Sequence, residues 1–159
     1  MKRSAGLLLA LATLLAACRP SGAAVEAVGS GTFPCPAFHA CIAWLAIRPE
    51  PWSPPLGWTP GKGDARFIAQ QDGNGTMTVS GLAGGGPDGL LPGDYVLLLV
   101  YGEVDDTRSF IPGTDDEPTK GLLNTTIACE GPATVTEGAD VLVIAATFGP
   151  VCAIEAASR

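Results

Sequence analysis

The side chains of this chain that could do chemistry are few: five cysteines, one histidine and a run of acidic residues. The histidine, His39, lies between Cys35 and Cys41, and no serine has the G-x-S-x-G surroundings of a hydrolase nucleophile. A hydrolytic triad needs a base, and a cysteine held in a disulfide cannot act as a nucleophile. These residues predict a protein that is not an enzyme.

The acidic run is the candidate metal site. Five carboxylates are crowded into one short stretch: Asp105, Asp106, Asp115, Asp116 and Glu117. Calcium is a hard cation that prefers oxygen ligands, so this stretch offers a calcium site and, as an alternative function, a calcium-dependent envelope enzyme. The spacing matches no EF-hand loop, and acidic runs are usually solvated surface. We therefore expect no cofactor and retain calcium as the alternative.

Four of the five cysteines read as a disulfide framework. Apart from Cys18, the chain has Cys35, Cys41, Cys129 and Cys152, an even number that is typical of two disulfides in an exported protein. Three pairings are open, and we favour the two local ones, 35 with 41 and 129 with 152. The close CxxC pairs of structural zinc sites do not occur.

The first 17 residues have the layout of an export signal. Lys2 and Arg3 form a positively charged start, and residues 6–17 are an apolar run of the length of a signal-peptide core. A membrane-spanning helix needs roughly 20 apolar residues, so this run is too short to cross a bilayer.

The end of the run, Leu15-Ala16-Ala17-Cys18, resembles the lipobox of bacterial lipoproteins. The resemblance implies a diacylglyceryl group on the Cys18 thiol, cleavage before Cys18 and acylation (palmitate) of the new amine. Two or more acyl chains anchor a protein stably. The implied location is the bacterial cell envelope, and the outer membrane is favoured over the inner one in a Gram-negative host because Arg19, not aspartate, follows the cysteine.

The mature chain, residues 18–159, suits one domain with a real core. Removal of Lys2 and Arg3 leaves seven basic residues against sixteen acidic ones, so the formal charge falls from −7 to −9. Such a surface repels phosphate backbones, which excludes nucleic acid as a partner. The partners we expect are the membrane, through lipid on Cys18, and an envelope protein or glycan.

The mature chain reads as a flexible tether, residues 18–32, followed by a folded domain, residues 33–159. The tether is small, polar and rich in glycine. Residues 49–63 contain five prolines and predict a long, stiff loop. Trp52 and Trp58 in this loop are candidate binding residues, although we expect them to lie across an open end of the domain and to cover its core.

Short apolar or alternating runs separated by Gly/Pro turns predict strands and no helix. Residues 64–80 predict a hairpin around the turn Asp72-Gly73-Asn74-Gly75. Residues 95–101 are apolar on both faces and predict a central, doubly covered strand. The other strands are expected at residues 41–47, 122–129, 133–136, 141–147 and 151–155. The fold class is therefore all-β, a single antiparallel β-sandwich of about seven strands, Ig-like or prealbumin-like.

Three segments carry a further resemblance: DGNGTMTVSGL, LPGDYVLLLVY and TVTEGADVLVIAATF. They resemble the transthyretin-like sandwiches, including the carboxypeptidase-regulatory-like and Cna-B-like domains, over residues 64–147. The chain departs from that pattern by an insertion, AGGGPDGLL, between Leu82 and Pro92. The lipobox, the strand pattern and the missing catalytic set together predict a lipid-anchored, non-catalytic binding or accessory module, with a structural spacer as the alternative.

Overall fold

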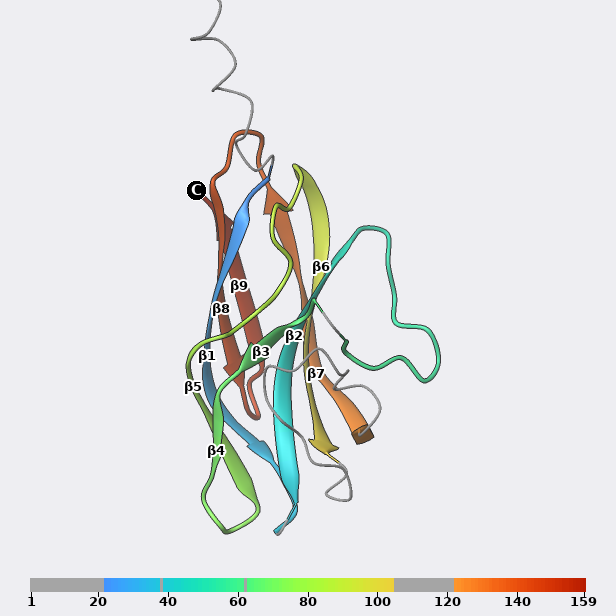
Figure 1. Ribbon diagram of the computed structural model, residues 1–159, viewed down its shortest axis with the longest axis vertical. Coiled ribbons are helices and arrows are strands. Elements are labelled where there is room, and N and C mark those ends of the chain that lie inside the picture. Colours follow the sequence, from blue (N-terminus) through green and yellow to red (C-terminus); the bar gives the residue numbers. More distant parts are fainter. Residues whose placement is uncertain (1–21, 38, 62, 105–121) are drawn as a thin grey trace, which may run out of the picture.

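The computed structural model describes residues 22–37, 39–61, 63–104 and 122–159. Within these ranges every regular element is a β-strand, and the strands form two sheets packed face to face (Figure 1). The nine strands are β1 (Ala24–Pro34), β2 (Ala40–Pro49), β3 (Ala65–Phe67), β4 (Ala69–Gln71), β5 (Thr76–Leu82), β6 (Gly93–Val104), β7 (Leu122–Val135), β8 (Val141–Phe148) and β9 (Ala153–Ser158). The prediction of an all-β sandwich is confirmed. The described part of the chain holds no helix of the length and apolarity that a membrane crossing needs.

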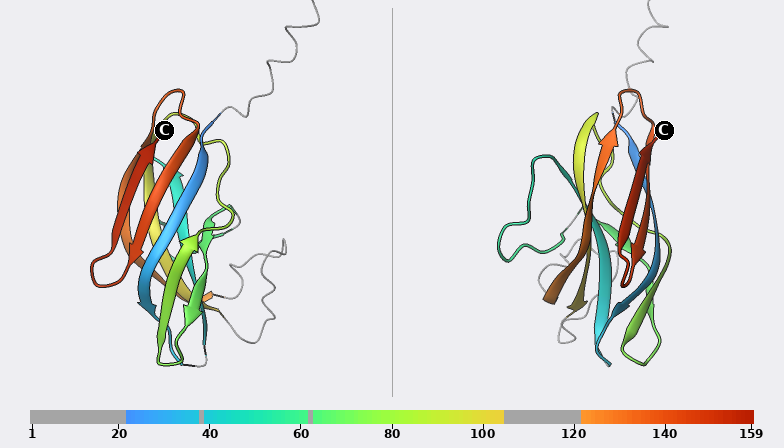
Figure 2. Two further views of the ribbon diagram at one scale, coloured as in Figure 1. Left: turned by 90° about the vertical axis from the view of Figure 1, so that its left-hand side faces the viewer. Right: turned by 180° about the vertical axis from the view of Figure 1, so that it is seen from behind.

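One sheet has five strands in the order β4-β5-β1-β8-β9, and the other has four in the order β3-β2-β6-β7. Every pair of neighbours is antiparallel except β1 and β8, which pair in parallel from Ala24 with Val141 to Gly31 with Phe148. The expectation of a purely antiparallel sandwich is wrong at this pair. Both strands run away from the end of the sandwich at which the C-terminus lies (Figures 1 and 2).

The prediction of a flexible tether over residues 18–32 is wrong from Ala24 onward, because Ala24–Pro34 form β1, the central strand of the five-stranded sheet. Its glycines serve close packing rather than flexibility. A Cβ atom on Gly29 would lie 2.5 Å from Cδ1 of Phe67, and one on Gly31 would lie 2.0 Å from the carbonyl oxygen of Phe148. Small residues therefore let β1 pack beneath Phe67 of the facing sheet and against the backbone of its neighbour β8.

The predicted hairpin at residues 64–80 is present, with a change of sheet inside its first arm. β3 pairs with β2 in the four-stranded sheet, whereas β4 pairs with β5 in the five-stranded sheet. The exposed Ile68 separates these two short strands. In the turn, Oδ1 of Asp72 accepts hydrogen bonds from the backbone N–H groups of Asn74 and Thr76.

Strand β6 is covered on both faces, as its sequence predicts. Leu97 and Leu99 enter the main core between the sheets, and Leu98 and Val100 enter a smaller cluster on the outer face of the four-stranded sheet. All four side chains are buried. The main core also takes aromatic and aliphatic residues from β1, β2, β3, β5 and β8.

Both disulfides join the cysteines that the sequence favours. Cys35 is bonded to Cys41 at the far end of β1, and Cys129 on β7 is bonded to Cys152 just before β9. The second bond crosses from one sheet to the other. It therefore links the two layers at one lateral edge of the sandwich.

We expect Gly29→Val to lower the free energy of unfolding by about 1–3 kcal/mol, because the added carbon atoms overlap the Phe67 ring and Val79. Gly84→Ala is the matched control, since a Cβ at Gly84 meets nothing within 4 Å. Urea denaturation of both variants measures the difference. Equal stability of Gly29→Val and the wild type would contradict the packing role of β1.

Candidate binding cleft between the sheets

β7 and β9 are the last strands of the two sheets and lie together at one lateral edge of the sandwich. This edge is closed over the half that lies toward the C-terminus of the chain (Figure 1). A Cβ on Gly131 of β7 would lie 3.3 Å from Cβ of Ile154 on β9, so the two strands are in close contact there. The Cys129–Cys152 disulfide lies at the limit of this closed part. Absence of a side chain at residue 131 is what permits the close approach.

Beyond the disulfide the same edge is open. β7 continues back to Leu122, whereas β8 ends at Phe148 and β9 does not begin until Ala153. Opposite β7, Leu99 pairs with Cys129 and Val100 with Ile127, so Ala128 is the extra residue of a β-bulge. The lower part of β7 diverges from β8 and β9 in both views (Figures 1 and 2). The result is a cleft of about 450 Å³ between the sheets.

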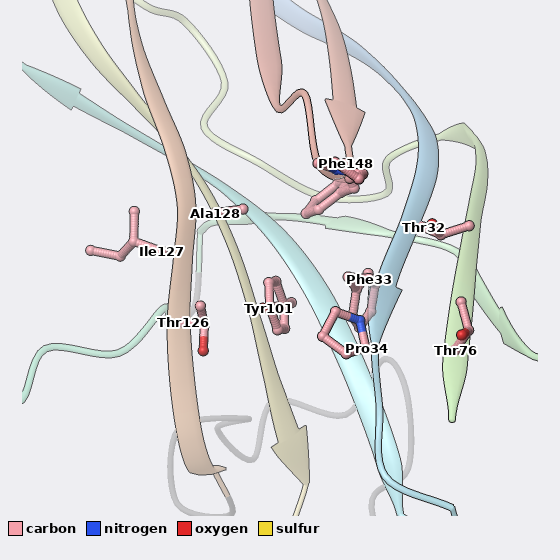
Figure 3. A pocket seen from close by; sticks show the side chains of 11 residues that line it. Thr32, Phe33, Pro34, Thr76, Tyr101, Thr126, Ile127, Ala128 and Phe148 are labelled. Atoms are coloured by element: carbon pink, nitrogen blue, oxygen red, sulfur yellow. The ribbon is translucent and has the colours of Figure 1, made fainter. Parts of the chain in front are cut away.

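The floor of the cleft is aromatic (Figure 3). Phe33 of β1 stacks on Tyr101 of β6 with ring centroids 4.8 Å apart, and Phe148 of β8 approaches Phe33 at 5.7 Å. Phe33 and Phe148 are also core residues, so packing within the sandwich holds their rings in place. The partly exposed Tyr101 ring, held by these buried rings, can contribute contact area without a large loss of side-chain entropy on binding.

The rim of the cleft is polar but uncharged. Thr32 and Thr76 lie on the wall formed by β1 and β5, and Thr126 lies on the wall formed by β7 (Figure 3). The Ala128 methyl group points toward the cleft, whereas the Ile127 side chain points away from it. An apolar floor within a hydroxyl rim is the usual composition of a ligand site, and it suits a neutral or apolar ligand.

The two loop tryptophans lie elsewhere, on the outer face of the four-stranded sheet, where they form a tryptophan cluster with Arg48 and Asp64. The Arg48 guanidinium lies 5.5 Å from the ring centroid of Trp52 and 5.7 Å from that of Trp58. The two rings meet edge to face at 5.3 Å. Arg48 also binds both carboxylate oxygens of Asp64, at 2.6 and 3.0 Å.

The tryptophan cluster covers apolar side chains of the sheet. Trp52 and Trp58 pack against Ala46, Leu98 and Val100, whose side chains are buried on that outer face. The two tryptophans therefore cover buried apolar side chains, as expected. They cover the outer face of a sheet, however, and not an open end of the domain. The Pro-rich loop that carries them projects beside β2 and β6 (Figure 1).

A second cleft, of about 430 Å³, lies between Trp52 and β7. Its lining includes the carboxylates Glu50 and Glu130, the Ser53 hydroxyl and the Val96 side chain. One wall is thus an aromatic ring that Arg48 contacts, and the rest is a mixture of polar and apolar groups. Trp52 remains a candidate binding residue for this reason.

Two further groups on the four-stranded sheet show the effect of burial. Trp44 is completely buried, and its indole N–H has no hydrogen-bond acceptor in the described part of the chain. Arg66 pairs with Trp44 in the register between β2 and β3, and burial lowers the pKa of its guanidinium from the ordinary value.

The other residues singled out in the sequence are spread apart or lie outside the described residues. Nδ1 of His39 lies 3.1 Å from Oε2 of Glu103, at the end of the sandwich opposite the C-terminus. Cys18 and the acidic run from Asp105 to Glu117 fall outside the described ranges. Among the residues that are described, no three His, Cys, Asp or Glu side chains come together as a metal site.

Sequence reasoning did not find the residues of the inter-sheet cleft. Phe33, Tyr101 and Phe148 come from three strands far apart in the chain, and each reads as an ordinary core aromatic. Comparisons with protein-family models, with curated proteins and with solved structures gave no significant match.

We expect Asp64→Ala to cost about 3–5 kcal/mol of stability, because it leaves the guanidinium of Arg48 without its carboxylate in a mostly buried place. It also removes the acceptor of the Gly61 N–H, 2.8 Å from Oδ2. Asp88→Ala, at an exposed position, is the control and should change stability by no more than about 0.5 kcal/mol. Chemical denaturation followed by tryptophan fluorescence measures both. Similar losses in the two variants would contradict the structural role of the ion pair.

Proposed function

We propose that the chain is a lipid-anchored, non-catalytic β-sandwich of the bacterial cell envelope that binds another envelope component in the inter-sheet cleft. The observation that carries this proposal is the cleft itself: the partly exposed Tyr101 ring, backed by the buried rings of Phe33 and Phe148, lies between two sheets within a rim of hydroxyl groups. A protein that served only as a structural spacer would have no use for an open cleft. We would expect its edge to be closed along the whole length, as it is where β7 contacts β9.

Several features support an envelope location. The first 18 residues have the order of a lipoprotein signal, with a charged start, an apolar run and Leu15-Ala16-Ala17-Cys18. The two disulfides agree with an oxidising compartment. The acidic mature chain disfavours nucleic acid as the partner.

The position of the cleft suits a protein tethered through Cys18. Only residues 19–23 separate Cys18 from β1, and β1 begins at the end of the sandwich that carries the C-terminus (Figure 1). At about 3.3 Å per residue, Phe33 lies roughly 30 Å farther along β1 than Ala24. Anchoring at Cys18 would therefore hold the closed end toward the bilayer and the cleft away from it, accessible to a partner.

The described residues also support a non-catalytic role. His39 is the sole histidine in the chain, and its ring nitrogen is paired with Glu103 rather than with a hydroxyl or thiol nucleophile. Four cysteines are held in disulfides. Binding without turnover is what an aromatic cleft with hydroxyl groups at its rim can do.

Lipidation is tested by mass spectrometry of the N-terminal peptide of protein extracted from membranes. We expect a diacylglyceryl-modified, acylated cysteine at position 18 and no trace of residues 1–17. Cys18→Ser should leave the full-length, unmodified precursor, because the thiol is the acceptor of the lipid. A free mature N-terminus at any other residue would contradict the anchor.

Binding in the cleft is tested by photocrosslinking in cells. A benzoylphenylalanine at Thr126, on the cleft wall, should give a discrete crosslinked product with another envelope component. The same amino acid at Gln70, an exposed residue of the opposite edge strand β4, is the control and should give none. Equal crosslinking from both positions would overturn the proposed function. Turnover of a hydrolase substrate by the purified protein, abolished by a chelator, would also overturn it.

A further inference from the structure

The outer edge of β7 is the feature that the proposed function leaves unexplained. β7 is the last strand of its sheet, and within the described part of the chain it pairs with β6 on one side and with no strand on the other. It is also the longest strand, with 14 residues. Its free edge presents a row of backbone N–H and C=O groups that can pair with another strand.

The two halves of this edge differ in how they resist such pairing. The half next to β9 carries the charged Glu130 and Pro132, which has no N–H to donate. The half that borders the cleft, residues 122–128, contains no proline and no charged residue. The edge is therefore blunted where the sandwich is closed and open to pairing where the cleft opens.

We propose that the cleft binds an extended peptide segment of another protein, which adds to the four-stranded sheet along residues 122–128 of β7. This inference rests on the proposed function, since it names the ligand of the same cleft. An added strand would lie about 4.8 Å from β7 and take the place opposite the missing continuation of β9.

The geometry also specifies the side chains of such a peptide. In a strand, alternate side chains point to the same face, so every second residue would enter the space above Phe33, Tyr101 and Phe148. That aromatic floor suits bulky apolar residues at these positions. The positions between them would point to the opposite face of the sheet, toward solvent, which suits polar residues there.

The test uses the lipidated full chain in detergent micelles and a synthetic probe, acetyl-Lys-Thr-Val-Thr-Phe-Thr-Val-Thr-Lys-amide. We expect the peptide to slow hydrogen exchange of the β7 amides in residues 122–128 and to bind with a measurable affinity by fluorescence anisotropy of a labelled copy. Two N-methylated versions separate backbone pairing from simple apolar contact. One carries N-methyl groups at the Thr positions and the other at the Val and Phe positions.

Because alternate N–H groups of a strand point to the same side, one methylated peptide should lose at least tenfold in affinity, and the other should stay within about threefold. Ala128→Phe, which fills the cleft from β7, should also weaken binding at least tenfold. Ala145→Phe is its matched control, because Ala145 is an exposed residue of β8 that does not line the cleft. Thr126→Trp, at the cleft residue of β7 that pairs with Tyr101, replaces Ala128→Phe if that variant does not fold.

Equal binding of both methylated peptides, or equal binding by Ala128→Phe and the wild type, would overturn strand addition. A concentration-dependent dimer that protects residues 122–128 without peptide would also overturn it, because a second copy would then occupy the edge. Crosslinking from Thr126 in cells together with no binding of the probe peptide would remove this inference and leave the proposed function standing.

Discussion

The structure depends on the close packing of β1 against its neighbours in the middle of the five-stranded sheet. Without β1 there would be two separate hairpins, β4–β5 and β8–β9, because β1 is the strand that pairs with both β5 and β8. Its inner face passes beneath Phe67 of the facing sheet and beside Val79 of the neighbouring strand β5, which leaves no room for a side chain at Gly29. The aromatic residue at its far end, Phe33, then becomes part of the cleft floor. A single requirement for small residues thus supports both the core and the candidate site.

The same lateral edge of the sandwich is closed at one end and open at the other for local reasons. Gly131 allows β9 to approach β7, and the Cys129–Cys152 disulfide holds the two sheets together beside that contact. The bulge at Ala128, the residue before Cys129 in β7, shifts the register with β6. In the part of β7 that precedes the bulge, the strand diverges from β8 and β9. Bulges commonly re-aim strands next to functional sites, and here the bulge lies at the wall of the cleft.

The outer face of the four-stranded sheet is covered in a different way. Apolar side chains of β2 and β6 there would face water if the Pro-rich loop did not place Trp52 and Trp58 over them. Arg48 lies against both rings, and its charge is balanced by the almost completely buried carboxylate of Asp64. Prolines restrict the loop before folding and so lower the entropy that is lost when the rings are held in place. The loop tryptophans are therefore part of the fold, whatever else Trp52 contacts.

By itself the sequence determined the class of fold, the central strand at residues 95–101 and the turn at Asp72, because each depends on residues close together in the chain. For the disulfides it favoured the two local pairs but left three pairings open, and the tertiary structure decided between them. Local reasoning failed at β1, since glycine-rich composition is the same for a flexible tether and for a strand that must pass beneath bulky side chains. Only the tertiary structure decided that Phe33, Tyr101 and Phe148 meet at an open edge. They come from three strands in two sheets, and the edge is open only because β8 ends and β9 begins short of the full length of β7.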